Sequence, residues 1–220
     1  MIKAILFDYD GTLSNRMQSA YNKYKADCKE IFPELDPNGV EFDAIVQRCL
    51  NWDEFGTITK SHVYENLNRV YKVNVDVGKY MDKWVKEFPL YQVLQKDCKE
   101  IVEKLGKKYR LGVITNGSSY SQHAKLENTG LKKYFECVFV SGDYGIHKPN
   151  KEIFLMAAKE MNLKPEEIAF IGDTYATDIL GAHRAGMYPI WFFNDPLRGS
   201  DADIKRIHHF DELLEIFDVE

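Results

Sequence analysis

The chain has 220 residues, of which 45% are hydrophobic, and it carries a formal net charge of -5 at pH 7. A chain of this length can bury one substantial core and leave room for a second, smaller unit. The negative charge and the lack of a long basic run argue against nucleic acid or a membrane as the main partner. No apolar run approaches the roughly 20 residues of a transmembrane helix, and Asp8 interrupts the apolar N-terminus too early for a signal peptide. We therefore expect a soluble cytoplasmic protein.

The first predicted strand covers residues 2–7 and is almost continuously apolar, which is typical of a strand buried on both faces of a parallel sheet. Similar runs that end in polar or glycine residues follow at 110–116, 137–142, 168–173 and 189–194. Helical patterns separate or follow them at 97–108, 119–129, 150–162, 175–185 and 210–217. Strands that alternate with helices of this length predict βαβ units. The expected fold class is α/β, with a Rossmann-like three-layer core around a parallel sheet and an inserted α-helical domain.

The interval between residues 15 and 89 contains no comparable strand. Amphipathic helical patterns fill it instead, at about 21–31, 42–50, 63–71 and 77–88. Because a connection from a strand to a helix is normally only a few residues long, an insertion of this size needs a small core of its own. We expect residues 15–89 to form a helical cap, and residues 1–14 and 90–220 to form the α/β core.

Some side chains of the expected cap could contact a substrate. Trp52, Phe55 and Tyr64 could stack on a planar group, and basic residues such as Lys60 could meet a second polar feature. Aromatic residues at helical spacing more often form the core of a small domain. Core packing is therefore the favoured interpretation, and substrate contact is the alternative.

Two carboxylates follow the first predicted strand, in the segment Asp8-Tyr9-Asp10-Gly11-Thr12. On an extended chain, side chains two positions apart point the same way, so we expect Asp8 and Asp10 to share one small volume. That volume would lie at the carboxyl edge of the sheet, where open parallel sheets bind ligands. Two carboxylates about 4 Å apart repel each other by roughly 4 kcal/mol at an effective dielectric constant of 20. A divalent cation would relieve this repulsion, and oxygen ligands without nearby cysteine or histidine favour Mg²⁺.

Three further strand ends carry residues that suit a phosphate or metal site. Thr115 offers a hydroxyl, and Asn116 precedes a predicted helix whose first amides favour an anion. Lys148 offers a positive charge for a phosphate oxygen. Asp173 ends a buried strand, and Asp178 follows one helical turn later. Because the carboxyl ends of parallel strands meet at one edge of a sheet, we expect these groups to lie together.

This ordered set of motifs resembles the haloacid dehalogenase superfamily, specifically its Mg²⁺-dependent phosphatase branch with a helical cap after the first strand. The resemblance covers nearly the whole chain, although the cap is similar only in position and helical character. It implies that Asp8 is a nucleophile that forms an aspartyl phosphate, and that Asp10 protonates the leaving oxygen and then activates water. It also implies that Thr115, Asn116 and Lys148 hold the phosphoryl group.

The same resemblance implies a metal site. Mg²⁺ would bind Asp8, the backbone carbonyl of Asp10 and Asp173, with Asp178 in the outer shell or as an additional ligand. Branches of the superfamily that cleave carbon–halogen bonds usually lack an aspartate at the position of Asp10, so this residue favours phosphoryl transfer. We expect an enzyme that hydrolyses a small phosphorylated metabolite, such as a nucleoside monophosphate or a sugar phosphate. A phosphomutase of the same superfamily and a catalytically silent protein that binds a phosphorylated ligand are the alternatives.

Overall fold

The computed structural model describes residues 1–192 and 202–219. The chain divides into two compact units, one made of Met1–Asn15 and Leu94–Glu220 and the other of Arg16–Val93. We call the first the α/β unit and the second the helical unit, and each is described by itself. Among the described residues, no helix combines the length and the apolar character that crossing a bilayer requires.

The α/β unit is built on a parallel sheet whose strand order, within the described residues, is β3-β2-β1-β4-β5-β6. The strands are β1 (Ala4–Phe7), β2 (Arg110–Thr115), β3 (Cys137–Val140), β4 (Ile168–Gly172), β5 (Tyr188–Phe192) and β6 (Lys205–Ile207). Since β1 lies between β2 and β4, the chain adds strands on one side of β1 first and on the other side later. In open α/β sheets, the carboxyl ends of the strands at such a reversal form the usual ligand site. The expected α/β fold with a parallel sheet is confirmed.

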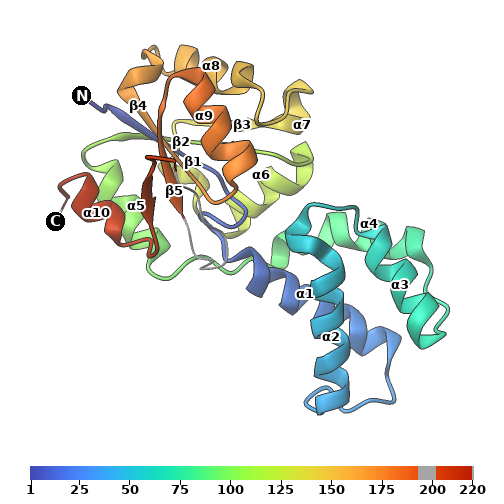
Figure 1. The fold of residues 1–220 in the computed structure, drawn as a ribbon. Coiled ribbons are helices and arrows are strands. Elements are labelled where there is room, and N and C mark those ends of the chain that lie inside the picture. Colours follow the sequence, from blue (N-terminus) through green and yellow to red (C-terminus); the bar gives the residue numbers. More distant parts are fainter. Residues whose placement is uncertain (193–201, 220) are drawn as a thin grey trace. The chain divides into compact units, whose positions relative to one another are not determined.

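Helices cover both faces of this sheet, as Figure 1 shows for α8 and α9 on one side and α5 and α10 on the other. The helices of the unit are α5 (Cys98–Gly106), α6 (Ser119–Asn128), α7 (Ser141–Tyr144), α8 (Lys151–Glu160), α9 (Leu180–Ala185) and α10 (Glu212–Ile216). Ile5 and Phe7 of β1 pack into one core cluster with α5, α6 and α10, whereas Ala4 and Leu6 pack into another with α8 and α9. Alternate residues of a strand face opposite sides, so covering both faces requires a continuously apolar strand.

Some element boundaries differ from those predicted. The third strand ends at Val140, and Ser141 already begins α7. The predicted helix 175–185 begins as a π-helical turn, Tyr175–Ile179, and continues as α9. The strand β6 is missing from the prediction because three residues are too few to show a periodic pattern. The last two residues of the predicted strand 189–194 lie outside the described residues.

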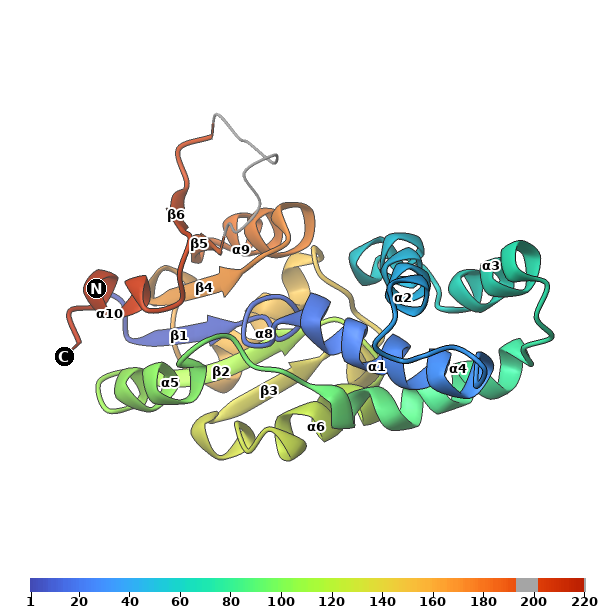
Figure 2. The ribbon, with the colours of Figure 1, turned by 90° about the horizontal axis from the view of Figure 1, so that it is seen from below.

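The helical unit has a core of its own. Its helices are α1 (Arg16–Ile31), α2 (Val40–Asp53), α3 (Ser61–Tyr71) and α4 (Val77–Glu87), with short 3₁₀ turns at Glu54–Gly56 and Phe88–Tyr91. Helix α1 packs on α2, α2 on α3 and α3 on α4 (Figure 2). Tyr64 is fully buried in this core, and its hydroxyl donates to Asp27 at 2.8 Å. Phe55, by contrast, is exposed. The side chain of Tyr64 is therefore part of the core.

A buried carboxylate in this unit, Asp53, is surrounded by partners. Its carboxylate oxygens form ion pairs with Arg16 Nη1 and with Lys60 Nζ, each at 2.7 Å. The hydroxyl of Tyr24 donates a further hydrogen bond at 2.8 Å. Burial by itself raises the pKa of Asp53, but the two cations outweigh burial and hold the pKa below its ordinary value of 3.8. The charge of Asp53 is thus fully balanced by the protein.

Candidate active site

Asp8 lies directly after β1 at the carboxyl edge of the sheet. Its backbone N–H donates to the carbonyl of Ile171 at 2.8 Å, which extends the pairing of β1 with β4 by one residue and fixes its position. The carboxylate is buried, and its Oδ1 accepts a hydrogen bond from Lys148 Nζ at 2.6 Å. Burial raises the pKa of Asp8 to about 7 although Lys148 opposes the rise, and the charge of Asp178 adds to it. The site therefore favours either a proton or a further cation at Asp8.

Three carboxylates meet at this edge, those of Asp8, Asp173 and Asp178. One oxygen of each lies within 4.8 Å of the others. Asp173 follows β4, and burial together with the charges of Asp178 and Asp8 raises its pKa well above the ordinary value. Lys148 pairs with Asp8 at 2.6 Å and with Asp178 at 2.7 Å, so one buried lysine offsets only part of the charge of the three carboxylates. A donor set made only of carboxylate oxygens with an excess of negative charge fits a hard divalent cation such as Mg²⁺.

Two glycines permit this close approach of acidic side chains. Gly11 has a φ of +92°, and a Cβ atom there would lie 2.3 Å from Oδ2 of Asp173. At Gly172, a Cβ atom would lie 2.4 Å from the Cβ of Asp178. Contacts below 3.0 Å are essentially never seen for real Cβ atoms, so any side chain at either position would push a carboxylate out of place. The lack of a side chain at Gly11 and Gly172 thus allows the carboxylates to lie close together.

Asn116 holds the backbone segment that carries Lys148. Its Nδ2 donates to the carbonyl of Lys148 at 3.0 Å, and the backbone N–H of Lys148 donates to Asn116 Oδ1 at 2.9 Å. Burial lowers the pKa of Lys148, but Asp178 and Asp8 outweigh burial and raise it, so the ammonium stays charged. Since both ends of the amide bind the backbone of Lys148, the structure gives Asn116 a positioning task. The phosphate contact expected of its side chain stays a prediction.

Thr115 ends β2 at the same edge of the sheet, and its hydroxyl is buried. The residue is 1% exposed, and its Oγ1 has no hydrogen-bond partner within the described residues. A buried polar atom without a partner costs about 1–3 kcal/mol. Such atoms in native proteins commonly mark a place where water or a ligand supplies the missing bond. A phosphoryl oxygen would be a suitable acceptor for this hydroxyl.

The side chain of Asp10 is contacted by residues of α6. The chain turns after Asp8, where the Tyr9 carbonyl accepts backbone hydrogen bonds from Leu13 and Ser14. The carboxylate of Asp10 accepts hydrogen bonds from Lys125 Nζ at 2.6 Å and Gln122 Nε2 at 2.9 Å. Each of the two carboxylates thus pairs with a lysine of its own, and the cation expected between Asp8 and Asp10 stays a prediction. The metal contact expected of the Asp10 backbone carbonyl stays a prediction.

Gln122 and Lys125 belong to the site, although the sequence analysis did not assign them a role. Both lie on α6, three residues apart, and each is 3% exposed. A signal for them exists in the sequence. The helical spacing that places Leu126 in the core also places Gln122, Lys125 and Thr129 on or near the buried face. A polar stripe on the face that normally carries apolar residues indicates buried polar partners.

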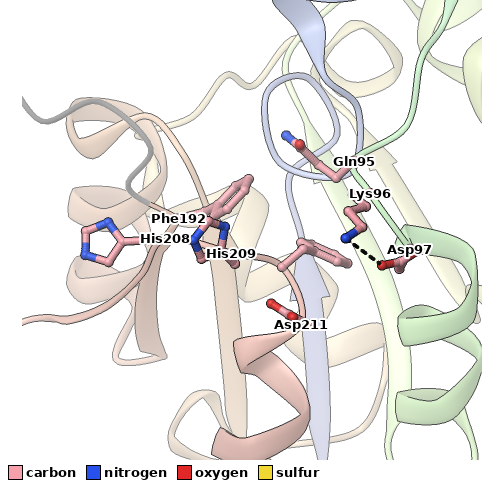
Figure 3. Close-up of a pocket in the computed structure, with 8 residues that line it drawn as sticks. Gln95, Lys96, Asp97, Phe192, His208, His209 and Asp211 are labelled. Atoms are coloured by element: carbon pink, nitrogen blue, oxygen red, sulfur yellow. Dashed lines mark ion pairs between the residues drawn. The ribbon is translucent and has the colours of Figure 1, made fainter.

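A separate pocket of about 410 Å³ lies elsewhere in the α/β unit. Residues 95–97, Phe192 and 208–211 line it, and Figure 3 shows Lys96 paired with Asp97 at its rim. The pocket lies near the loop after β1, because Gln95 Nε2 donates to the Gly11 carbonyl at 3.1 Å. Its lining, as far as the structure describes it, includes none of the residues predicted for catalysis. The pocket is thus distinct from the carboxylate cluster.

Comparison with known proteins places the chain in a family. Residues 5–192 match the family model described as haloacid dehalogenase-like hydrolase. The chain belongs to this family. A glyceraldehyde 3-phosphate phosphatase from Pyrococcus furiosus is 29% identical over 100% of this chain and 94% of that protein. One from Methanopyrus kandleri is 31% identical over 86% of this chain and 83% of that protein.

One further relative and two solved structures also resemble the chain. The pyrimidine 5'-nucleotidase YjjG of Escherichia coli is 31% identical over 54% of each chain. The HAD hydrolase YfnB of Bacillus subtilis, solved bound to magnesium, shares the fold with a TM-score of 0.79, 24% identity and 99% coverage of both chains. A HAD phosphatase from Thermococcus onnurineus has a TM-score of 0.69 and 25% identity, with coverage of 100% of this chain and 99% of that chain. The expected resemblance to the phosphatase branch is confirmed.

Proposed function

We propose that this haloacid dehalogenase-like hydrolase is a cytoplasmic, Mg²⁺-dependent phosphatase that hydrolyses small phosphate monoesters through an aspartyl phosphate on Asp8. One observation carries the proposal: the carboxylates of Asp8, Asp173 and Asp178 converge at the carboxyl edge of the parallel sheet, and Lys148 pairs with two of them, Asp8 and Asp178. This arrangement combines a carboxylate nucleophile with the charges needed to bring a phosphate dianion beside it.

The metal would be held by Asp8, Asp173 and Asp178, together with the backbone carbonyl of Asp10. The fit is supported by the donor set, which is all oxygen, and by the raised pKa values of Asp8 and Asp173. Bound Mg²⁺ would offset the excess negative charge and polarise a phosphoryl oxygen. Removing the metal should therefore remove the activity.

In the first half of the reaction, an Asp8 oxygen forms a bond to phosphorus while the bond from phosphorus to the leaving oxygen breaks. Lys148 holds Oδ1 of Asp8 and leaves Oδ2 to attack. The charge of Lys148 reduces the repulsion between the carboxylate and the phosphate dianion, and Thr115 Oγ1 donates to a phosphoryl oxygen. Asp10 gives a proton to the leaving oxygen, so the alcohol departs neutral.

In the second half, water attacks the phosphorus of the aspartyl phosphate. Asp10, now ionised, takes a proton from that water, and the bond from phosphorus to Asp8 breaks. The products are inorganic phosphate and the original Asp8 carboxylate, and Asp10 has regained its proton. General acid–base catalysis of this kind contributes roughly 10²–10⁴-fold to a rate. The same residue serves both halves because the two proton transfers run in opposite directions.

The substrate classes to test follow from the relatives, whose names include glyceraldehyde 3-phosphate phosphatases and a pyrimidine 5'-nucleotidase. A panel of sugar phosphates, triose phosphates and nucleoside monophosphates covers these classes, and p-nitrophenyl phosphate serves as a general reporter. Release of inorganic phosphate should depend on Mg²⁺ and disappear with a chelator. The matched control for Asp8→Asn is Asp97→Asn, since Asp97 is an exposed aspartate that should tolerate the same change.

Two results would contradict the proposal. Binding of a phosphorylated compound without turnover of any panel member would identify a silent binding protein. Transfer of the phosphoryl group between two positions of a sugar, with no net release of phosphate, would identify a phosphomutase.

A further inference from the structure

Asp10 is held by two buried side chains of α6. The proposed reaction requires Asp10 to exchange protons with two different oxygens, and such transfers need a well-defined orientation of the carboxylate. Its side chain is 21% exposed, so burial alone does not fix it. Both contacts from α6 end on the same oxygen, Oδ2. The helix thus holds the carboxylate at one end.

Lys125 provides the stronger of these contacts. Its side chain is 4% exposed, and its Nζ lies 2.6 Å from Oδ2 of Asp10. A buried ammonium is expensive unless it is paired, so this charge belongs with the Asp10 carboxylate. The ammonium also lies 5.7 Å from the centre of the Tyr9 ring, within the range of a cation–π contact. Lys125 is therefore fixed against the loop that carries both Asp8 and Asp10.

Gln122 joins this loop to the end of β2. Its Nε2 donates to Asp10 Oδ2 at 2.9 Å and to the carbonyl of Asn116 at 3.1 Å. Gly117 makes room for it, because a Cβ atom at Gly117 would lie 2.5 Å from the same Nε2. The amide of Gln122 thus links the candidate acid–base residue to the segment that also positions Lys148.

We propose that Lys125 and Gln122 are positioning residues that hold the Asp10 carboxylate in the orientation from which it exchanges protons with the leaving oxygen and with water. This inference rests on the proposed function. If the two residues only supported the fold of α6 and the loop, replacing them would lower the activity on every substrate by the same factor. The two roles differ in how activity depends on the leaving group.

The leaving group separates the two roles because it sets the need for an acid. p-Nitrophenolate is stable as an anion and departs without a proton, whereas the alkoxide of an alkyl phosphate needs one. A misplaced Asp10 should therefore slow an alkyl phosphate much more than p-nitrophenyl phosphate. The quantity to measure is kcat/KM, since it reports the step in which the leaving group departs.

The experiment compares kcat/KM for p-nitrophenyl phosphate and for the alkyl phosphate that the wild-type enzyme hydrolyses fastest. We expect Lys125→Met to lose at least about tenfold more activity on the alkyl phosphate, within the range of general acid catalysis. Gln122→Leu should show the same selectivity with a smaller loss, about threefold, because it removes a neutral donor. Lys132→Met is the matched control, since Lys132 is half exposed and pairs with Glu127 on the surface, and it should leave both values unchanged.

Asp10→Asn separates a failure of this inference from a failure of the proposed function. If Asp10→Asn shows the selective loss and Lys125→Met and Gln122→Leu slow both substrates equally, the positioning role is wrong and the proposed function stands. If Asp10→Asn shows no selectivity, or the wild-type enzyme hydrolyses neither ester, the proposed function itself is wrong. Circular dichroism checks folding, and Gln122→Leu alone decides the outcome if Lys125→Met does not fold.

Discussion

Two buried acidic sites, Asp53 in the helical unit and the carboxylate cluster in the α/β unit, differ in their charge balance. In the helical unit, Asp53 has two cations and a tyrosine hydroxyl around it, and its pKa lies below the ordinary value. In the α/β unit, Lys148 pairs with Asp8 and Asp178, Asp173 lies in the same cluster, and the pKa values of Asp8 and Asp173 are raised. The charge of Asp53 is therefore balanced by neighbouring cations, whereas the charge of the carboxylate cluster is not.

This difference indicates which cluster is built for function. A balanced buried ion pair needs nothing from outside the protein, so its residues support the local structure. An unbalanced cluster costs folding free energy, and proteins retain such clusters mainly where a ligand or a reaction uses them. Each substitution below changes the balance in one of the two units.

The largest effect should come from Asp8→Asn, which removes the proposed nucleophile from the unbalanced cluster. Loss of a nucleophile that acts with its neighbours as a unit lowers turnover by at least about 10⁴-fold. The fold should persist, because the substitution keeps the shape of the side chain and removes a charge that repels its neighbours. Phosphate release and circular dichroism test the two parts, and a variant with normal turnover would show that another residue is the nucleophile.

Lys148→Ala should have the next largest effect, because it removes the buried cation that pairs with Asp8 and Asp178. Turnover should fall by about 10²–10³-fold, as it does when one electrostatic contact to the reacting group is removed. Removing one partner of a buried pair also costs about 3–5 kcal/mol of stability. Kinetics at saturating Mg²⁺ and chemical unfolding measure these effects, and a loss confined to stability would leave Lys148 with a structural role only.

Asp53→Asn should break the balanced cluster without involving the carboxylates of the α/β unit. Arg16 and Lys60 would lose their counter-charge, and the free energy of unfolding should fall by about 3 kcal/mol at pH 7. Because the pKa of Asp53 in the folded protein is below 3.8, its stabilising charge is present above that value. The difference between the wild-type protein and the variant should then shrink as the pH falls through the folded-state pKa.

Urea unfolding at pH 7 and at about pH 3 measures this difference. An unchanged difference at the two pH values would show that the ionised carboxylate of Asp53 is not the source of its stabilising effect. The pH dependence of unfolding thus tests the charge balance around Asp53 independently of catalysis.

The smallest effect should come from a pair that is balanced but exposed, Arg110 and Glu136. Solvent screens such pairs, and their contribution is typically about 0–1 kcal/mol. Glu136→Gln should accordingly change stability by less than about 1 kcal/mol and leave turnover unchanged. A larger loss of stability in thermal unfolding would mean that charge balance matters at the surface as much as in the interior.

Much of the fold is predictable from the sequence because the buried strands are continuously apolar. The runs at 2–7, 110–116 and 168–173 correspond to β1, β2 and β4, since helices cover both faces of these strands. The predicted third strand extends beyond β3 because Ser141 and Gly142 begin a short helix, a change that hydrophobicity does not reveal. The strand β6 is too short to be recognised in this way.

The site is predictable to the extent that it depends on topology. Parallel strands carry Asp8, Thr115 and Asp173 to one edge whatever their rotamers are, so their shared location follows from the order of the motifs. The partner of Asp10 does not follow from topology. It depends on the turn after Asp8 and on which face of α6 lies against that turn. The residues of the first loop predict neither of these features.

Binding of Mg²⁺ tests the central claim most directly, namely that the carboxylate cluster of the α/β unit takes up a divalent cation in addition to the charge of Lys148. Isothermal titration of the purified protein with MgCl₂ should show one site per chain. Asp173→Asn should abolish that binding, whereas Asp53→Asn should leave it intact because its carboxylate is already balanced. A wild-type protein that binds no Mg²⁺, or an Asp173→Asn variant that binds it as well as the wild type does, would contradict the claim.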